Sequence, residues 1–529
     1  MFLHLYSNNF CKKAKKILNN PLNFEMKKQS FLESILCNLN SKCKYKNIIY
    51  KIYKKEQDFI KENMKVIEEE LKALDFPYFY YSYNNQVFHY YIDYVRDFFK
   101  IKETGQIKES KYLLRLIKFF YFNELLFFIE NDVVKFEKDG KDLIIFPKKD
   151  YLKYLRRRWF AIQWEKESQR NDRVEIEIIK QLSIKYKNIS IEIFSKHLMD
   201  KAFYLKEDYI SLKNKKKEQY MFMKNLCIFL SILFLSEDNK IHINDPIFSY
   251  FNIEKIFLNE IIEINKGLSL IDRAFNYENQ VFTLNTDKDL YLLLRIFLVN
   301  KYKNKLSNIT SKFGDIFEDY IKKYLVDNIN EDYDIITDNI DYKENNKNVD
   351  IDIVLYDKKK KFYYLVQVKF TLNINAYLKE EIKNICNNKL LKKGVSQLEN
   401  VKNLLSSPKF LIYLKDRKIN INKNNFALIL VHTTFQYDFQ TIGDVILYDW
   451  NTFRNLLKKG RMIQNYINNF GVENFEISNK ETLSLENVDG VIDYLMKQSN
   501  MEKMFSIFIE TPYYIPGVFN KINIVSYIK

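Results

Sequence analysis

Apolar and polar residues alternate over two short stretches, 349–355 and 364–369, and this alternation predicts a β-strand in each. The segment between them, 357–361, is rich in lysine and short enough to form a hairpin turn. The sequence therefore predicts that these two strands pair as an antiparallel hairpin.

Four polar side chains fall on this predicted hairpin. Asp350 and Asp352 are two residues apart and are expected on one face of the first strand, and Gln367 and Lys369 share a face of the second. Strand pairing would bring carboxylates, an amide oxygen and an ammonium group into one small site. Such a set suits a hard cation beside a water nucleophile, which indicates phosphodiester chemistry.

The pattern on both sides of the hairpin is that of an α/β region. A helix carrying Glu318 is expected to run to about residue 328, and a polar helical stretch is expected at about 376–406. Asp449 is expected to cap a helix that reaches Leu457. Further strands are predicted at 333–340, 426–432 and 445–448.

The first 305 residues have a mainly helical pattern with one hairpin signal. Asp139-Gly140 lies between alternating apolar runs within 133–146 and is typical of a two-residue turn. The apolar run 226–235 is too short to span a bilayer and is expected to be a buried helix. The aromatic stretch 76–100 could stack on nucleic-acid bases, but packing between helices is the more common role of such residues. Other helices are predicted at 58–74, 175–186, 290–303 and 486–499.

These changes of pattern divide the 529-residue chain into several domains. We expect a mainly α-helical N-terminal region followed by an α/β domain with a central mixed sheet flanked by helices. The predicted regions are 1–150, helical with a β-hairpin near 133–146; 151–305, helical; 306–465, the α/β domain; and 466–529, a C-terminal extension.

Charge and composition narrow the class of protein. The 84 basic and 68 acidic residues give a net charge of +16, which favours a polyanionic partner such as nucleic acid. A generic lysine-rich surface explains the same excess equally well. The hydrophobic fraction of 47% and the charged fraction of 29% indicate a folded chain rather than a disordered one.

Several functional classes are disfavoured by motifs that the sequence lacks. Its five cysteines form no CxxC pair and it has only five histidines, so buried thiols in a reducing cytosol fit better than a zinc site. The absence of a GxxxxGK[ST] motif argues against a built-in P-loop ATPase. No apolar signal segment or membrane span is recognised, so we expect a cytoplasmic protein without a membrane partner.

Arg156, Arg157 and Arg158 form a cluster in a chain whose basic residues are mostly lysine. Contact with nucleic-acid phosphates is one interpretation. A solvated helix face that pairs with Glu165 and Glu167 is the other, and the more common one.

The order of the elements in about 308–450 resembles the PD-(D/E)XK nuclease superfamily, whose members share the restriction-endonuclease-like fold. Asp352 precedes the apolar residues Ile353-Val354-Leu355 and matches the metal-binding aspartate of that family. Gln367 and Lys369 match the (D/E)-x-K pair, with glutamine where a carboxylate is more usual. The resemblance implies that 306–465 is a PD-(D/E)XK nuclease-like domain.

Three further residues supplement this motif. Glu318 matches the acidic residue that many members carry on the first helix, and Gln397 matches a helix-borne glutamine that some members place near the active site. Because Gln367 removes one negative charge, weaker metal binding is expected unless Asp350 contributes.

The resemblance implies a Mg²⁺-dependent endonuclease in which Mn²⁺ can take the place of Mg²⁺. Asp352, Gln367 Oε1 and the Val368 carbonyl would bind the metal. Lys369 would orient or deprotonate the water and stabilise the developing negative charge. Glu318 would bind the metal through water or hold a second ion.

DNA is the expected substrate of this hydrolase, and RNA stays open. Restriction or anti-phage defence is the expected setting, by analogy with multi-domain members of the superfamily. The alternative is a catalytically inactive nuclease-fold protein that binds nucleic acid or serves as a scaffold subunit in a larger complex. A protein partner or a homo-oligomer is compatible with either function.

Overall fold

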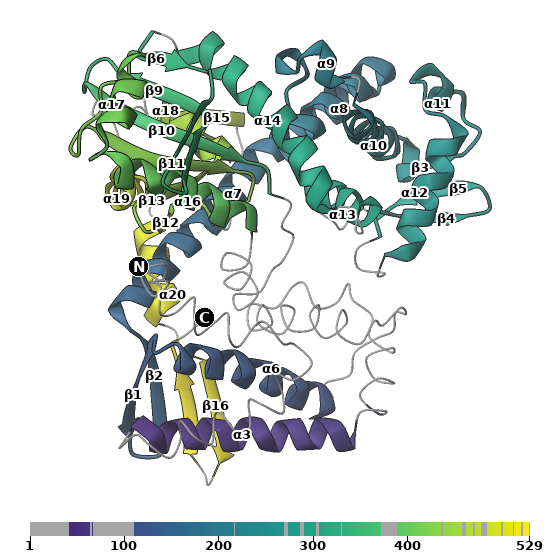
Figure 1. Cartoon of the computed structure of the whole chain (residues 1–529). Coiled ribbons are helices and arrows are strands. Elements are labelled where there is room, and N and C mark those ends of the chain that lie inside the picture. Colours follow the sequence, from purple (N-terminus) through teal and green to yellow (C-terminus); the bar gives the residue numbers. More distant parts are fainter. Residues whose placement is uncertain are drawn as a thin grey trace. The chain divides into compact units, whose positions relative to one another are not determined.

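The structure is a computed structural model of the whole chain (Figure 1). It forms two compact units, Met1–Arg156 with Asn375–Cys386 and Ser499–Lys529, and Arg157–Ile374 with Asn387–Gln498. The residues that it describes are 42–63, 66, 111–215, 217–268, 273–285, 290–302, 306–329, 331–371, 389–434, 437–457, 462–468, 471–477, 484–498, 501–510, 513–519 and 522–527. The aromatic stretch 76–100, most of the predicted helix 58–74 and the first part of 376–406 lie outside these ranges.

The first unit contains one sheet of order β1-β2-β17-β16, which joins residues 134–147 to residues 513–526. The predicted hairpin is confirmed: β1 and β2 pair through the loop Gly140–Lys141, in which Gly140 has a φ of +53°, open to glycine without strain. β17 then pairs in parallel with β2. The elements are α3 (Lys42–Glu62), α6 (Lys111–Glu130), β1 (Val134–Asp139), β2 (Asp142–Pro147), α20 (Met501–Glu510), β16 (Tyr513–Phe519) and β17 (Ile522–Ser526).

Helices α3 and α6 pack together beside this sheet, and their contact is both apolar and charged. Tyr53 stacks on Phe119 with ring centroids 5.2 Å apart. Glu56 is only 5% exposed and accepts a hydrogen bond of 2.6 Å from Nε of Arg115, which also lies over the ring of Phe59. A carboxylate this buried needs such a charged partner.

The second unit begins within the long helix α7 (Lys149–Ser183), which starts in the first unit. Its helical part confirms the predicted N-terminal helical region, and the apolar run 226–235 lies in the buried helix α10. None of the helices in the described part of the chain is long and apolar enough to cross a bilayer. The elements are α8 (Lys187–Phe203), α9 (Leu212–Lys215), α10 (Glu218–Phe234), β3 (Lys240–His242), α11 (Pro246–Tyr250), α12 (Lys255–Gly267), β4 (Phe275–Glu278), β5 (Val281–Leu284) and α13 (Leu290–Lys301), with short 3₁₀ turns at Glu207–Tyr209 and Glu237–Asn239.

A mixed six-stranded sheet of order β12-β13-β11-β10-β9-β6 follows in the same unit (Figure 1). β6, β9 and β10 are antiparallel, whereas β10, β11 and β13 run parallel. The parallel strands are buried along nearly their whole length, which explains their continuous apolar runs. The strands of this sheet are β6 (Tyr333–Ile336), β9 (Ile353–Asp357), β10 (Phe362–Lys369), β11 (Phe426–His432), β12 (Gln440–Ile442) and β13 (Val445–Asp449). Two separate two-stranded sheets are formed by β7 (Ile340–Glu344) with β8 (Lys347–Ile351) and by β14 (Met462–Asn468) with β15 (Gly471–Ile477).

Helices cover both faces of this sheet. Gly394 of α16 lies against the side chains of Gln367 and Lys369, and Phe317 of α14 packs on Phe370. Because neighbouring side chains on a strand alternate, α16 and α14 lie on opposite faces. Trp450 of α18 packs edge-on against α14, so α18 lies on the α14 face. The helices of this part are α14 (Leu306–Ile329), α16 (Lys389–Leu404), α17 (Pro408–Lys415), α18 (Trp450–Leu457) and α19 (Val488–Gln498).

The units do not follow the predicted domain boundaries. α14 packs against the helical part as well as the sheet: the ring of Phe317 contacts that of Tyr204, and Tyr320 Oη donates to Asp200. The predicted regions 151–305 and 306–465 therefore lie mostly in one unit. The predicted extension 466–529 is divided, since its last strands complete the sheet of the first unit.

Most predicted strands around the hairpin are confirmed, with one correction. The predicted strand 333–340 is two strands, β6 and β7, in different sheets. The turn before β10 is held by Asp357, whose Oδ1 accepts the N–H groups of Lys359 and Lys360 at 3.0 and 2.8 Å. Asp449 caps α18 as expected, accepting the N–H of Asn451 at 2.9 Å.

Two buried aspartates meet where β13 ends. Asp438 Oδ1 accepts the N–H groups of Phe439 and Asp449, and its Oδ2 accepts the hydroxyl of Thr452 at 2.5 Å. Burial raises the pKa of Asp449 to about 6. Burial, with the charge of Asp449 added to it, also raises the pKa of Asp438 well above its ordinary value. The pair therefore holds protons that an unfolded chain releases.

We expect Asp438→Asn to reduce the pH dependence of folding stability. Both folded pKa values lie above the ordinary 3.8, so wild-type stability falls as the pH rises from about 4 through 6. For Asp449 the rise of the pKa from 3.8 to about 6 corresponds to about 3 kcal/mol, to which Asp438 adds in the same direction. Asparagine keeps the oxygen that accepts both N–H groups but has no carboxyl proton to release. Urea unfolding of the variant should therefore show a smaller loss of unfolding free energy between pH 5 and pH 8 than urea unfolding of wild type.

The matched control for this variant is Asp334→Asn, because Asp334 is exposed on β6 and pairs with Lys358 at 3.2 Å. It should leave the pH dependence unchanged. An equal loss of unfolding free energy in wild type and Asp438→Asn would show that Asp438 holds no proton.

Candidate functional site

The predicted strand 349–355 is interrupted at Asp352, because β8 pairs with β7 and β9 pairs with β10. The Asp352 N–H still donates to the Val366 carbonyl at 3.0 Å. Its side chain turns back toward β10, where Oδ2 accepts the N–H of Val368 at 2.7 Å. The Asp352 carboxylate thus accepts the Val368 N–H in place of a backbone carbonyl of β9, at the point where the β9–β10 ladder ends.

Asp352 is 3% exposed, and its environment disfavours its charge. Burial raises the pKa of this carboxyl group to about 7, and the carboxylates of Glu318 and Asp350 add to the increase. Lys369 and the Val368 N–H act in the opposite direction. A raised carboxyl pKa beside a lysine is typical of functional sites.

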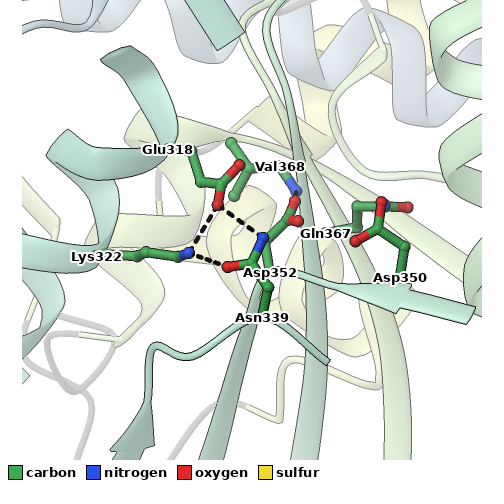
Figure 2. Close-up of polar contacts among 7 residues, drawn as sticks. All are labelled: Glu318, Lys322, Asn339, Asp350, Asp352, Gln367 and Val368. Atoms are coloured by element: carbon green, nitrogen blue, oxygen red, sulfur yellow. Dashed lines mark hydrogen bonds and ion pairs between the residues drawn. The ribbon is translucent and has the colours of Figure 1, made fainter. Parts of the chain in front are cut away.

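Asp350, Gln367 and Gln397 form a closed triangle of hydrogen bonds. Gln367 Nε2 donates to Asp350 Oδ2 and to Gln397 Oε1, each at 3.1 Å, and Gln397 Nε2 donates to Asp350 Oδ2 at 3.0 Å. Figure 2 shows Asp350 and Gln367 together on one side of Asp352. Asp350 and Asp352 therefore bind different partners instead of forming one ligand pair.

The triangle leaves one buried atom of Gln367 without a partner. Both protons of its amide are used, so the network fixes the amide orientation. Gln367 is 0% exposed, and its Oε1 accepts no hydrogen bond. A buried acceptor in this condition is costly unless a donor or a cation reaches it.

Gly394 is a site residue that the sequence did not single out. A Cβ atom at this position would lie 2.7 Å from Leu430 Cδ1, 3.1 Å from Gln367 Oε1 and 3.2 Å from Lys369 Cε. Glycine is therefore what lets α16 approach the strands closely enough for Gln397 to reach Asp350.

Glu318 reaches the site from α14, together with two residues that the sequence analysis missed. Lys322 Nζ lies 2.6 Å from Glu318 Oε1, and Asn339 Nδ2 donates to the same oxygen at 3.2 Å. Lys322 also donates to Asn339 Oδ1 (Figure 2). The i,i+4 spacing of Glu318 and Lys322 could have revealed the lysine, but nothing local marks Asn339.

The Val368 carbonyl lies on the same side of its strand as the Val368 N–H, which Asp352 accepts. The β9–β10 register ends at Ile353–Val366, so β9 offers no ladder partner there. The site thus combines a carboxylate, an amide oxygen and a carbonyl oxygen, the ligand types that Mg²⁺ prefers.

No group of three or more His, Cys, Asp or Glu side chains in the described residues has the geometry of a metal site. The donor set fits Mg²⁺ nevertheless, because two of its three oxygens come from an amide and a backbone carbonyl. Mg²⁺ usually keeps several waters, so few protein ligands suffice.

The arginine cluster on α7 is not one surface. Arg157 is 5% exposed, forms an ion pair with Asp489 at 2.8 Å and donates to Thr441 at 3.1 Å. The guanidinium group of Arg157 is therefore bound by partners within the protein, which argues against its predicted contact with nucleic acid. Arg156 and Arg158 are half-buried, and both have partners within the protein.

Comparisons of the chain with protein-family models, curated proteins and solved structures gave no significant match in any of the three. The function proposed below therefore rests on the site and on the charge of the chain.

Proposed function

We propose that this protein is a metal-dependent nuclease that hydrolyses phosphodiester bonds of DNA, with a restriction-endonuclease-like domain built around β6–β13. The observation that carries the proposal is made where β9 and β10 separate: Lys369 acts electrostatically on the buried Asp352, and the buried Gln367 Oε1 on the same strand as Lys369 has no hydrogen-bond partner. A cation bound at this position would supply a partner for Gln367 Oε1, and its positive charge would favour the ionised form of Asp352.

Each residue has a role in the proposed reaction. The Asp352 carboxylate, Gln367 Oε1 and the Val368 carbonyl would hold Mg²⁺, which when bound would polarise the phosphate and lower the pKa of water. Lys369, at the end of β10, orients the attacking water and stabilises charge on the phosphoryl oxygens. The water oxygen bonds to phosphorus as the bond to the leaving oxygen breaks, and a proton passes to that oxygen.

DNA is the proposed substrate because the chain carries a net charge of +16. Neutralising phosphates with lysine and arginine supplies most of the non-specific affinity for nucleic acid. RNA shares this chemistry, so the substrate test includes it. Restriction or anti-phage defence is the proposed setting.

A second candidate is a nuclease-fold protein that binds nucleic acid without cleaving it, alone or within a larger complex. The neutral Gln367 favours it, since a carboxylate there would bind a cation more strongly. It predicts salt-dependent DNA binding with no cleavage under Mg²⁺ or Mn²⁺.

The deciding experiment incubates the purified full chain with supercoiled, linear and single-stranded DNA and with RNA. Parallel reactions contain Mg²⁺, Mn²⁺ or EDTA. Cleavage that requires the metal and is strongest on DNA supports the first proposal. DNA binding without cleavage supports the second, and neither binding nor cleavage contradicts both.

Gln367→Glu is expected to tighten Mg²⁺ binding by about tenfold, because it adds a negative charge at a ligand position. The same change places a carboxylate against Asp350, now 3.1 Å from Gln367 Nε2, so the metal-free variant should also unfold at a lower temperature. Calorimetry and thermal unfolding measure the two effects.

Gln397→Glu is the matched control, since Gln397 donates to the same oxygen of Asp350 at 3.0 Å but is not a proposed ligand. It should lower the stability of the metal-free protein without the gain in metal affinity. A loss of Mg²⁺ binding in Gln367→Glu would count against Gln367 as a ligand.

A further inference from the structure

One oxygen of Glu318 is already occupied by a cation of the protein. Lys322 Nζ lies 2.6 Å from Glu318 Oε1, and the two side chains are only 16% and 23% exposed. Asn339 bridges them, donating to Glu318 Oε1 and accepting from Lys322. Both bonds to Glu318 end on its Oε1, and the third bond joins Lys322 to Asn339 Oδ1 (Figure 2).

The ion pair between Lys322 and Glu318 is stabilised by its position on the helix, by Asn339 and by partial burial. Lys322 is one helical turn after Glu318 on α14, the favourable orientation of such a pair. Asn339, between β6 and β7, fixes both side chains from outside the helix. Partial burial reduces screening by salt, so the ammonium group stays beside the carboxylate.

The charges of the site indicate how many divalent ions it can take. Three carboxylates (Asp350, Asp352 and Glu318) face two ammonium groups (Lys322 and Lys369), which leaves one net negative charge when all are ionised. One divalent ion turns this into one net positive charge, which complements a single phosphodiester. A second ion would add two more positive charges beside Lys322.

We infer that the site binds one divalent ion and that Lys322 takes the place of a second by supplying its positive charge at Glu318. This inference rests on the proposed function and deepens it, because it decides between a one-ion and a two-ion site. Lys322 acts through Glu318, so it is a positioning residue.

The test counts ions on the metal-free full chain by calorimetric titration with Mn²⁺. Wild type should bind one ion per chain. Lys322→Met keeps the length of the side chain without its charge and releases Glu318, so it should bind two. Lys322→Arg keeps the charge and should stay at one.

Lys323→Met is the control, since Lys323 follows on the same helix but donates to the Asp208 carbonyl, away from Glu318. It should bind one ion. Two ions on wild type, or one ion on a folded Lys322→Met protein, would overturn the inference, whereas no ion on wild type would overturn the metal-dependent function itself.

A second measurement uses wild type alone and does not depend on how a variant folds. Electron paramagnetic resonance of the Mn²⁺-loaded protein should show isolated ions. A spin-coupled pair of ions would overturn the inference while leaving the nuclease proposal standing.

Discussion

Lys369→Ala is expected to reduce DNA cleavage by about 10²–10⁴-fold while the protein stays folded. Lys369 is half-buried at the end of β10 and acts electrostatically on Asp352. In the proposed mechanism its loss removes the charge that orients the water and stabilises the phosphoryl oxygens. Initial rates on supercoiled DNA measure the effect, and circular dichroism checks the fold.

Asp352→Asn belongs to the same prediction, and it tests the negative charge of Asp352 separately from the hydrogen bond that this residue makes in the fold. Asparagine keeps an oxygen that can accept the Val368 N–H, now bound at 2.7 Å, so the strand junction should survive. The metal loses its only charged ligand in the proposed set, and cleavage should fall over the same range. Alanine is the less informative choice, because it would leave a buried N–H unpaired at a cost of about 1–3 kcal/mol.

Lys358→Ala and Asp334→Asn are the controls for this pair. These residues pair with each other at 3.2 Å near the opposite end of the hairpin, where both are well exposed. Cleavage should stay within about twofold of wild type, because exposed pairs of this kind contribute little. Wild-type rates in either Lys369→Ala or Asp352→Asn would remove the site from the proposed mechanism.

Gly394→Ala and Gly314→Ala are expected to change stability in opposite directions, although both glycines lie inside helices. A methyl group at Gly314 meets nothing within 4 Å, so helix propensity should stabilise that variant by about 0.5–1 kcal/mol. At Gly394 the same group meets Leu430, Gln367 and Lys369 at 2.7–3.2 Å. Overpacking costs about 1–3 kcal/mol and outweighs the gain in propensity.

The Gly394 variant should also lose activity, about tenfold or more, because moving α16 shifts Gln397 and through it the amide of Gln367. Urea unfolding and cleavage rates of the two variants give the comparison directly. Equal stabilisation by both substitutions would show that α16 does not need to approach the sheet this closely.

Local pattern was sufficient for the elements that carry the site. The β9–β10 hairpin, β11, β13, α14 and the Asp449 cap follow from alternation, helical spacing and capping chemistry, all of which act between residues close in sequence. For the same reason the sequence selected Asp352, Gln367 and Lys369, which lie at the end of that hairpin.

Contacts between distant segments could not be read in this way. The interruption of the strand at Asp352 depends on the pairing of β8 with β7. The pairing of β2 with β17 joins residues nearly 400 positions apart. Arg157 illustrates the same limit, since its partner Asp489 lies 332 residues away. A run of arginines has the same local pattern whether it faces solvent or a carboxylate of a distant segment.

The sequence by itself determined most of the strands, the helix with Glu318 and the types of polar side chain at the candidate site, because these depend on periodicity and on side-chain chemistry. Only the tertiary structure decided how the polar groups are shared: Asp350 with two glutamines, Asp352 with the Val368 N–H, and Glu318 with Lys322. Hydrogen bonds and ion pairs form between whichever groups packing brings within about 3 Å, and side-chain packing sets those distances.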